Sequence, residues 1–397
     1  MKMPLVYMDN NATTPIHPEV KKELIEKMDL YGNPSSMHEF GRTARKEVER
    51  ARELISGFIG AESDEVVFTG GGSESNNTVL KYVSCGDPAC TMCPASRREI
   101  ITSSIEHPSV LNTAEVISKG AIAVRYIGVD KYGKLNIEEL KERISEKTAL
   151  VSIMMANNEI GTIQNIKKIS QIAHRYGCLV HTDAVQALGK IPVNVQELDI
   201  DFMSFSGHKI YGPKGIGALY IKKGSPFCVF IHGGHQEAGR RAGTLNTLGI
   251  IGFGKAVELA GREMDEDARR IYRLRKKLET GILERIPDAL VNGHPDDCLP
   301  GTLNISFMGA EGESILLYLD LEGIAVSTGS ACATGSLDPS HVLIATGLGA
   351  ETAHGSIRFS IGRDNSDQDV EYVLDKLPPI IERIRKMSTV YVAGGKK

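Results

Sequence analysis

The sequence has no apolar run that approaches membrane-spanning length, and its start, MKMPLVYMDN, has no charged region followed by a long apolar core. It also has no long run of lysine or arginine, and its formal net charge is -4. Binding to the phosphates of nucleic acid needs a concentrated basic face. We therefore expect a mature cytoplasmic chain with no membrane and no nucleic-acid partner.

A disulfide framework is also absent, because the seven cysteines are odd in number and irregularly spaced. In a reducing compartment they are free thiols, metal ligands or catalysts. Cys85, Cys90 and Cys93 form a C-x4-C-x2-C pattern in a turn-rich stretch. Two alternatives stay open: a zinc or iron–sulfur site with a fourth ligand from elsewhere or from a second chain, and an ordinary loop of reduced thiols. The spacing favours the loop, since one Cys-x-x-Cys is half of a structural zinc site.

The P-loop lysine pattern and the dinucleotide fingerprint are missing too. Instead, the apolar strand predicted at 65–69 leads directly into Gly70-Gly-Gly-Ser73 and a predicted helix. Backbone N–H groups and the helix dipole can hold a phosphate in such an arrangement. The pattern suits a single phosphate, and the alternative is an N-capped helix after a flexible turn.

One lysine stands between two predicted strands, 201–205 and 216–221, which a Gly-Pro-Lys-Gly turn at 212–215 connects. Lys209 lies just beyond the first strand. A lysine there can attack an aldehyde cofactor if burial and neighbouring positive charge lower its pKa. The alternative is an ordinary solvated lysine in a hairpin.

Predicted strands and helices alternate from residue 99 to residue 182, which is typical of an α/β domain with a mainly parallel sheet. Ligands of such sheets bind beyond the carboxyl ends of the strands. The polar residues that follow the predicted strands are Ser73, Glu106, His107, Asn157, Asn158, Asp183, Gln186, Ser206, His208 and Lys209. A carboxylate, an imidazole, an amide and a lysine in one crevice meet the needs of pyridoxal phosphate.

The second reactive group is Cys332, in the stretch Ser327-Thr-Gly-Ser-Ala-Cys-Ala-Thr-Gly-Ser-Leu-Asp338. Small residues and two glycines allow such a loop to move and to expose its thiol. A long helical stretch to about residue 286 separates this part from the first α/β region. We expect a large cofactor-binding domain at 15–260 and a small domain, 1–14 with 261–397, that carries Cys332.

The chain resembles cysteine desulfurases of the class V aminotransferase family over nearly its whole length. The matching stretches are MDNNATTP (8–15), GNPSSMHEFG (32–41), VFTGGGSESNN (67–77), SSIEHPSV (103–110), NNEIGTIQ (157–164), HTDAVQALGK (181–190), SFSGHKIYGPKGIGALY (204–220), GGHQEAGRRAGTLN (233–246), STGSACATGSLDPSHVL (327–343) and SIRFSIGR (356–363). The resemblance implies the α/β pyridoxal phosphate fold type I: a mainly parallel seven-stranded-type sheet plus a smaller C-terminal α/β domain. It also indicates the group with the longer catalytic-cysteine loop.

By this resemblance the chain converts L-cysteine to L-alanine and keeps the sulfur as a persulfide on Cys332. The implied acceptors serve iron–sulfur cluster assembly or other sulfur-containing products, and Cys332 can ligate a cluster during transfer. The implied partners are a second copy of the chain in a homodimer and an acceptor such as an iron–sulfur scaffold. The end, MSTVYVAGGKK, lacks the extended tail that holds a scaffold in some members. The alternative activity is that of a selenocysteine lyase or another pyridoxal phosphate-dependent C–S lyase.

The same resemblance implies a role for each site residue. Lys209 binds the cofactor aldehyde as a Schiff base and moves protons at the substrate Cα, and His107 lies over the ring and transfers protons. Asp183 pairs with the pyridine nitrogen and Gln186 with the ring hydroxyl. The implied phosphate ligands are Gly72, Ser73, Ser206, His208 and, from the partner subunit, Thr244. The implied contacts to the substrate or cofactor are Arg358, Asn158 and Asn33.

Overall fold

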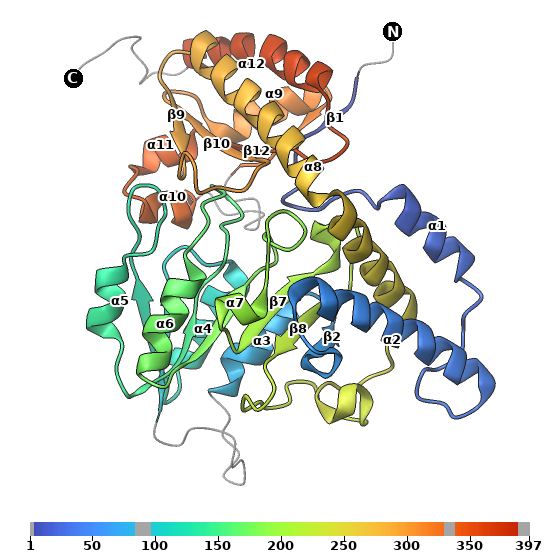
Figure 1. Cartoon of the computed structure of the whole chain (residues 1–397). Coiled ribbons are helices and arrows are strands. Elements are labelled where there is room, and N and C mark those ends of the chain that lie inside the picture. Colours follow the sequence, from blue (N-terminus) through green and yellow to red (C-terminus); the bar gives the residue numbers. More distant parts are fainter. Residues whose placement is uncertain (1–3, 84–96, 329–337, 388–397) are drawn as a thin grey trace.

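The computed structural model of the protein describes residues 4–83, 97–328 and 338–387. Figure 1 shows two masses of structure joined by the long helix α8 (Thr247–Arg285), one built on a large sheet and one on a small sheet. The predictions for Cys85, Cys90, Cys93 and Cys332 lie outside the described residues. Within those residues, no helix is long and apolar enough to cross a membrane.

The larger unit is organised around a sheet of seven strands in the order β2-β8-β7-β6-β5-β3-β4. All neighbouring pairs are parallel except those of β8, which runs antiparallel to both β2 and β7. The mainly parallel seven-stranded sheet is therefore confirmed. Its strands are β2 (Val66–Thr69), β3 (Glu99–Ser103), β4 (Ala123–Ile127), β5 (Thr148–Ser152), β6 (Leu179–Asp183), β7 (Phe202–Ser206) and β8 (Gly217–Ile221).

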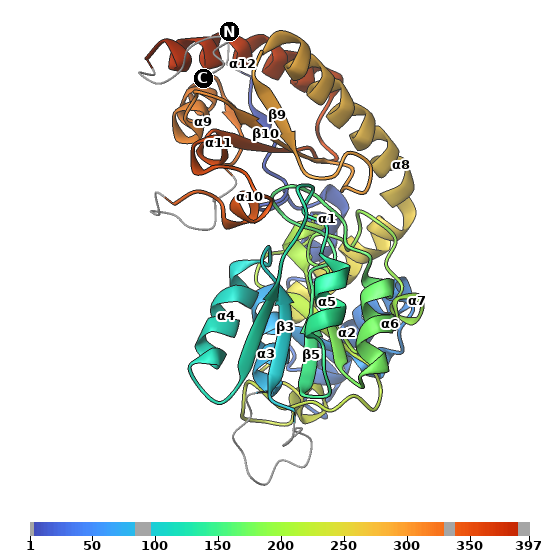
Figure 2. The same ribbon diagram turned by 90° about the vertical axis from the view of Figure 1, so that its left-hand side faces the viewer.

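Six of the seven strands are buried on both faces, which explains why their apolar residues do not alternate with polar ones; the edge strand β4 is mostly exposed. Successive side chains point to opposite faces, so Ile101 and Val151 join one hydrophobic cluster while Ile100 and Leu150 join the other. Helices cover both faces (Figure 2). The first face packs against α2 (Glu39–Ile59), α5 (Ile137–Arg143) and α6 (Ile166–Arg175), and the second against α3 (Gly72–Tyr82) and α4 (Pro108–Ser118).

Helix α2 begins earlier than its apolar spacing predicts. The regular apolar spacing begins only near Arg42, but the helix starts at Glu39, because His38 is the N-cap and its side chain accepts a hydrogen bond from the Gly41 N–H. The helix ends at Gly60, whose φ of 73° is the left-handed conformation that favours glycine. The polar loop before α2 is therefore shorter than its composition indicates.

The smaller unit contains an antiparallel sheet in the order β12-β10-β9 and a parallel pair, β1 with β11. These strands are β1 (Val6–Tyr7), β9 (Ala289–Asn292), β10 (Thr302–Phe307), β11 (Ile324–Ala325) and β12 (Ser356–Ser360). The helices are α9 (Gly312–Leu321), α10 (His341–Ala345), α11 (Ala350–His354) and α12 (Asp367–Met387). One hydrophobic cluster joins Val6 and Met8 to this unit and to the second half of α8. It supports the predicted domain division, which we keep as a proposal.

The segment that follows β1 passes from the small unit to the large one. Asn10 Nδ2 donates to the Ser360 carbonyl at 2.8 Å, and the Asn11 N–H donates to Ser360 Oγ at 2.9 Å. Thr14 then binds the His208 carbonyl, before α1 (Pro18–Glu26) packs along α8. The backbone of residues 9–14 is thereby fixed between the two units.

A buried ion pair ties a second loop to the large sheet. Arg52 of α2 donates to both carboxylate oxygens of Glu237, at 2.7 and 2.8 Å, and the Phe68 N–H donates to the same carboxylate at 2.8 Å. The Glu237 side chain is 1% exposed. Glu237 and Ala238 have φ of 49° and 56°, so the ion pair holds a backbone turn that non-glycine residues rarely adopt.

Replacing Glu237 with alanine should lower the free energy of unfolding by about 3–5 kcal/mol, because the buried arginine loses its only buried carboxylate among the described residues and keeps the half-exposed Glu49 alone. Glu49 provides a matched control, since it pairs with the same arginine but its side chain is 49% exposed. Its replacement should cost about 0–1 kcal/mol. Urea denaturation of both variants measures the difference, and equal losses would contradict this view of the ion pair.

Candidate active site

A cavity of about 260 Å³ lies at the carboxyl ends of the large sheet, closed on one side by the segment after β1. Most residues that the sequence analysis singled out line it. These are Gly72, Ser73, His107, Asn158, Asp183, Gln186, Ser206, His208, Lys209 and Arg358. Its other lining residues are Asn11, Ala12, Asn76, Ser109, Met154, Ala156 and Val185. The predicted crevice is therefore present in the fold.

The amine of Lys209 is held at the wall of this cavity. Strand β7 ends at Ser206, and a 3-10 turn, Gly207–Lys209, carries the lysine past the edge of the sheet. Lys209 Nζ donates to the carbonyl oxygens of Asn11 and Ala12, at 2.6 and 2.7 Å. The strand, turn and strand expected around Lys209 are confirmed, since β7 and β8 pair antiparallel. Two backbone carbonyls thus set where the amine can react.

Asp183 supplies a carboxylate to the same cavity from the end of β6. Its Oδ2 accepts a hydrogen bond from Asn76 Nδ2 at 2.7 Å, and its Oδ1 accepts one from the Val185 N–H at 2.9 Å. The residue is 6% exposed. Hydrogen-bond donors thus hold both carboxylate oxygens in place. A buried carboxylate of this kind fits a protonated pyridine nitrogen.

His107 is the N-cap of α4 and enters the cavity with a fixed tautomer. Its Nδ1 accepts a hydrogen bond from the Ser109 N–H at 3.1 Å, so a neutral ring carries its proton on Nε2. Burial lowers the pKa of His107, the Asp183 carboxylate opposes this shift, and the positive charge of Lys209 adds to it. The ring is therefore neutral at physiological pH and able to exchange a proton.

The start of α3 forms a cradle for an anion. The helix begins at Gly72 without a side-chain cap, so its first N–H groups face the cavity. A Cβ on Gly72 would lie 2.5 Å from Val185 Cγ2, so only glycine allows this close approach. Ser206 and His208 approach from β7, and burial lowers the pKa of His208 to about 4. These neutral donors fit a phosphate group.

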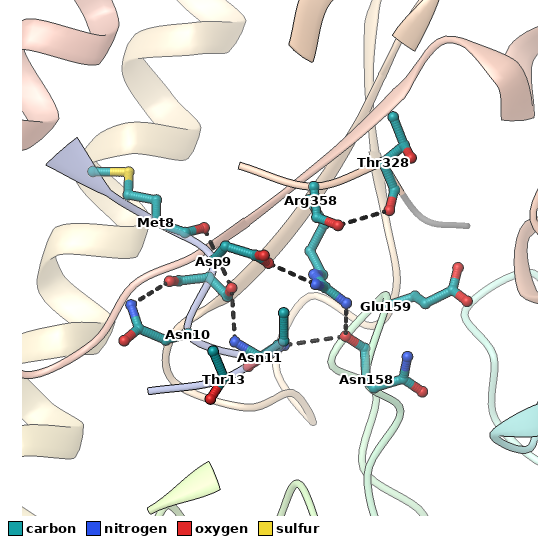
Figure 3. Close-up of polar contacts among 12 residues, drawn as sticks. Met8, Asp9, Asn10, Asn11, Thr13, Asn158, Glu159, Thr328 and Arg358 are labelled. Carbon is teal, nitrogen blue, oxygen red and sulfur yellow. Dashed lines mark hydrogen bonds and ion pairs between the residues drawn. The ribbon is translucent and has the colours of Figure 1, made fainter. Parts of the chain in front are cut away.

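Arg358 closes the other side of the cavity (Figure 3). Its Nη2 pairs with Asp9 Oδ1 at 2.7 Å, and its Nη1 donates to the Asn158 carbonyl at 3.0 Å. The residue is 3% exposed, and its Nε has no hydrogen-bond partner among the described residues. A buried guanidinium whose Nε–H is unused fits the carboxylate of a small substrate.

Four predicted residues do not line this cavity: Glu106 and Asn157, which are buried, and Asn33 and Thr244. Asn33 and Thr244 are both exposed on loops, and Asn33 Oδ1 accepts a hydrogen bond from the Ser35 N–H. Their proposed roles therefore stay predictions. The sequence analysis missed Asn11, whose carbonyl binds Lys209, although its polar segment directly follows the first strand. It also missed Lys190, which lies four residues after Gln186 in the motif HTDAVQALGK.

The whole chain is similar to known proteins. The family model described as aminotransferase class-V matches residues 6–373. The cysteine desulfurase IscS of Dictyoglomus turgidum is 49% identical over 384 residues, which cover 96% of each chain. The cysteine desulfurase IscS of Clostridium botulinum is 47% identical over 389 residues, which cover 97% of this chain and 96% of the relative. A solved structure described as a NifS-like protein has a TM-score of 0.89 and 39% identity, and the match covers 96% of this chain and 100% of that one.

Behind the cavity, His181 joins three strands of the sheet. Its Nδ1 lies 2.8 Å from Ser152 Oγ of β5, and its Nε2 lies 2.9 Å from Ser204 Oγ of β7. The side chain is fully buried, and burial lowers the pKa of His181 to about 3. Below its ordinary pKa of 6.5 the unfolded chain thus binds a proton that the folded chain excludes.

Stability should therefore fall as the pH decreases from 6.5 towards 3, and His181 should contribute up to about 1.4 kcal/mol per pH unit. In the variant His181→Asn this contribution to the slope should disappear. His354→Asn is the control, since His354 is exposed. Unfolding free energies measured across this pH range test the prediction, and a slope that His181→Asn leaves unchanged would contradict it.

Proposed function

The chain belongs to the class V aminotransferase family and is a pyridoxal phosphate-dependent cysteine desulfurase, and we propose that Lys209, His107 and Cys332 carry its chemistry. The single observation that best supports this assignment is the cavity itself. The amine of Lys209, the carboxylate of Asp183 and the guanidinium of Arg358 all line this cavity. These groups match an aldehyde, a pyridine nitrogen and a substrate carboxylate.

The cofactor would be held at its ring nitrogen and at its phosphate. Asp183 would pair with the ring nitrogen, while Ser73 at the start of α3, together with Ser206 and His208, would bind the phosphate. When bound, pyridoxal phosphate supplies a ring that accepts electrons from the substrate Cα. Asn76 supports this arrangement, because its donation to Asp183 Oδ2 holds the carboxylate in place.

We assign two proton transfers to residues of the cavity. Lys209 Nζ moves the proton at the substrate Cα, guided by the carbonyls of Asn11 and Ala12. His107 exchanges a proton through Nε2, since Ser109 holds its Nδ1 as an acceptor. A neutral imidazole can take up or give a proton near neutral pH.

Cys332 receives the sulfur. Its thiolate attacks the sulfur of the substrate, and an S–S bond forms as the Cβ–S bond breaks. The electron pair of the broken bond remains on Cβ, which is protonated to become the methyl group of alanine. The enzyme then holds a persulfide. We propose that an acceptor in iron–sulfur cluster assembly takes this sulfur from a cytoplasmic homodimer, in which the exposed Thr244 contributes to the phosphate site of the other subunit. Asn33 remains a predicted substrate contact.

Replacing Cys332 with serine tests the assignment. The holoenzyme should keep its visible cofactor absorbance, while persulfide on the protein and alanine release from L-cysteine should disappear. Persulfide labelling and alanine quantification measure both products. Cys298→Ser is the control, since burial raises the pKa of that thiol and it lies outside the cavity, and this variant should behave as wild type. Normal alanine release by Cys332→Ser would refute the role of Cys332.

Arg358→Lys should raise the KM for L-cysteine about 10- to 100-fold, because a lysine keeps the charge but loses the planar fork that binds a carboxylate. Steady-state kinetics measure the change. Arg363→Lys is the control. Arg363 follows the strand that carries Arg358, but it pairs with Glu263 and does not line the cavity. A lowered kcat with an unchanged KM would mean that Arg358 does not anchor the substrate.

A further inference from the structure

Lys190 lies beside the active site without belonging to its wall. Its Nζ donates to Gln186 Oε1 at 2.6 Å and to Asn11 Oδ1 at 3.3 Å. The side chain lines a smaller cavity of about 50 Å³, which shares Asn11 and Lys209 with the active-site cavity. Lys190 thus contacts two residues of the site from behind.

This contact fixes the orientation of the Gln186 amide. The ammonium group of Lys190 has only donors, so it pairs with the amide oxygen of Gln186. The amide nitrogen, Nε2, then points away from Lys190. Gln186 Nε2 accordingly donates to the Asn11 carbonyl at 2.9 Å, the same oxygen that accepts from Lys209 Nζ at 2.6 Å. If the amide were reversed, two donors would face each other at Lys190. The lysine therefore selects the end of the amide that faces the cavity.

The charges around Lys190 come from several elements. Lys209 follows β7 and Arg358 lies on β12, while Asp267 of α8 and Tyr211 line the same small cavity. Burial lowers the pKa of Lys190 to about 7, and the positive charges of Lys209 and Arg358 contribute. By the same electrostatic coupling, a protonated Lys190 disfavours added positive charge at Lys209.

We propose that Lys190 is a positioning residue that keeps Gln186 Nε2 directed at the ring oxygen of the cofactor. The inference rests on the proposed function and on the pairing of Gln186 with the ring hydroxyl that the family resemblance implies. A donor at this oxygen stabilises its anionic form, and the nearby positive charge acts in the same direction. Both effects disfavour protonation of the cofactor's link to Lys209. Lys190 therefore lowers the pH at which the bound cofactor titrates.

The test is a pH titration of the visible absorbance of the holoenzyme. Lys190→Met removes the donor and the charge but keeps the length of the side chain, and it should move the titration midpoint upward by about one pH unit. Lys190→Arg keeps a cation with donors and should restore most of the wild-type midpoint. A midpoint unchanged in Lys190→Met would overturn the proposal.

A double variant distinguishes positioning from a simple loss of charge. If Lys190 acts through Gln186, the midpoint shift of Lys190→Met combined with Gln186→Leu should equal the larger single shift. Additive shifts would contradict the indirect role. If Lys190→Met does not retain the cofactor, the same titration of Gln186→Glu tests the proposal. The carboxylate of this variant still pairs with Lys190 but offers no donor to the ring oxygen. That variant should also titrate at higher pH, and a wild-type midpoint would overturn the proposal.

The outcomes also separate this inference from the proposed function. A wild-type holoenzyme without a visible band that depends on Lys209 would refute the assignment of Lys209. A normal band with an unchanged midpoint in Lys190→Met would refute only the role of Lys190.

Discussion

The carbonyl oxygen of Asn11 is the point at which the reactive side chains meet. It accepts hydrogen bonds from Lys209 Nζ and from Gln186 Nε2, while the side chain of the same asparagine binds Lys190 and the Asn158 carbonyl. The Asn11 N–H is anchored on Ser360 Oγ of β12. One residue from the N-terminal segment thus joins groups from both structural units, so the geometry of the cavity depends on how the units pack.

The cavity brings several ionisable groups together, and their contacts decide how each can act. Two hydrogen bonds hold the Asp183 carboxylate in place, whereas burial lowers the pKa of His107. Lys190 and Lys209 lie close together, and each disfavours the protonation of the other. A site with one fixed carboxylate, one neutral imidazole and two mutually repelling amines suits proton transfer near neutral pH.

The sequence could predict the large sheet and most of the cavity, because alternating strands and helices place the residues after each strand at one edge. It could not predict Asn11, since a backbone carbonyl acts there and the contact spans almost 200 residues of chain. Lys190 was missed because it follows β6 in a turn, where spacing does not indicate which side chains touch. Asn33 and Thr244 came from the resemblance alone, and one chain does not bring them to its own cavity.

Asp9 is the counter-charge of the arginine that closes one side of the cavity. A guanidinium that is 3% exposed needs a counter-charge, and Asp9 provides one at 2.7 Å from Arg358 Nη2 (Figure 3). Under the proposed function, a substrate carboxylate at Nε would meet an arginine that Asp9 already partly neutralises. Asp9 and Asn11 are two residues apart on the same anchored segment. The counter-charge of Arg358 and the carbonyl that holds Lys209 therefore lie on one short stretch of backbone.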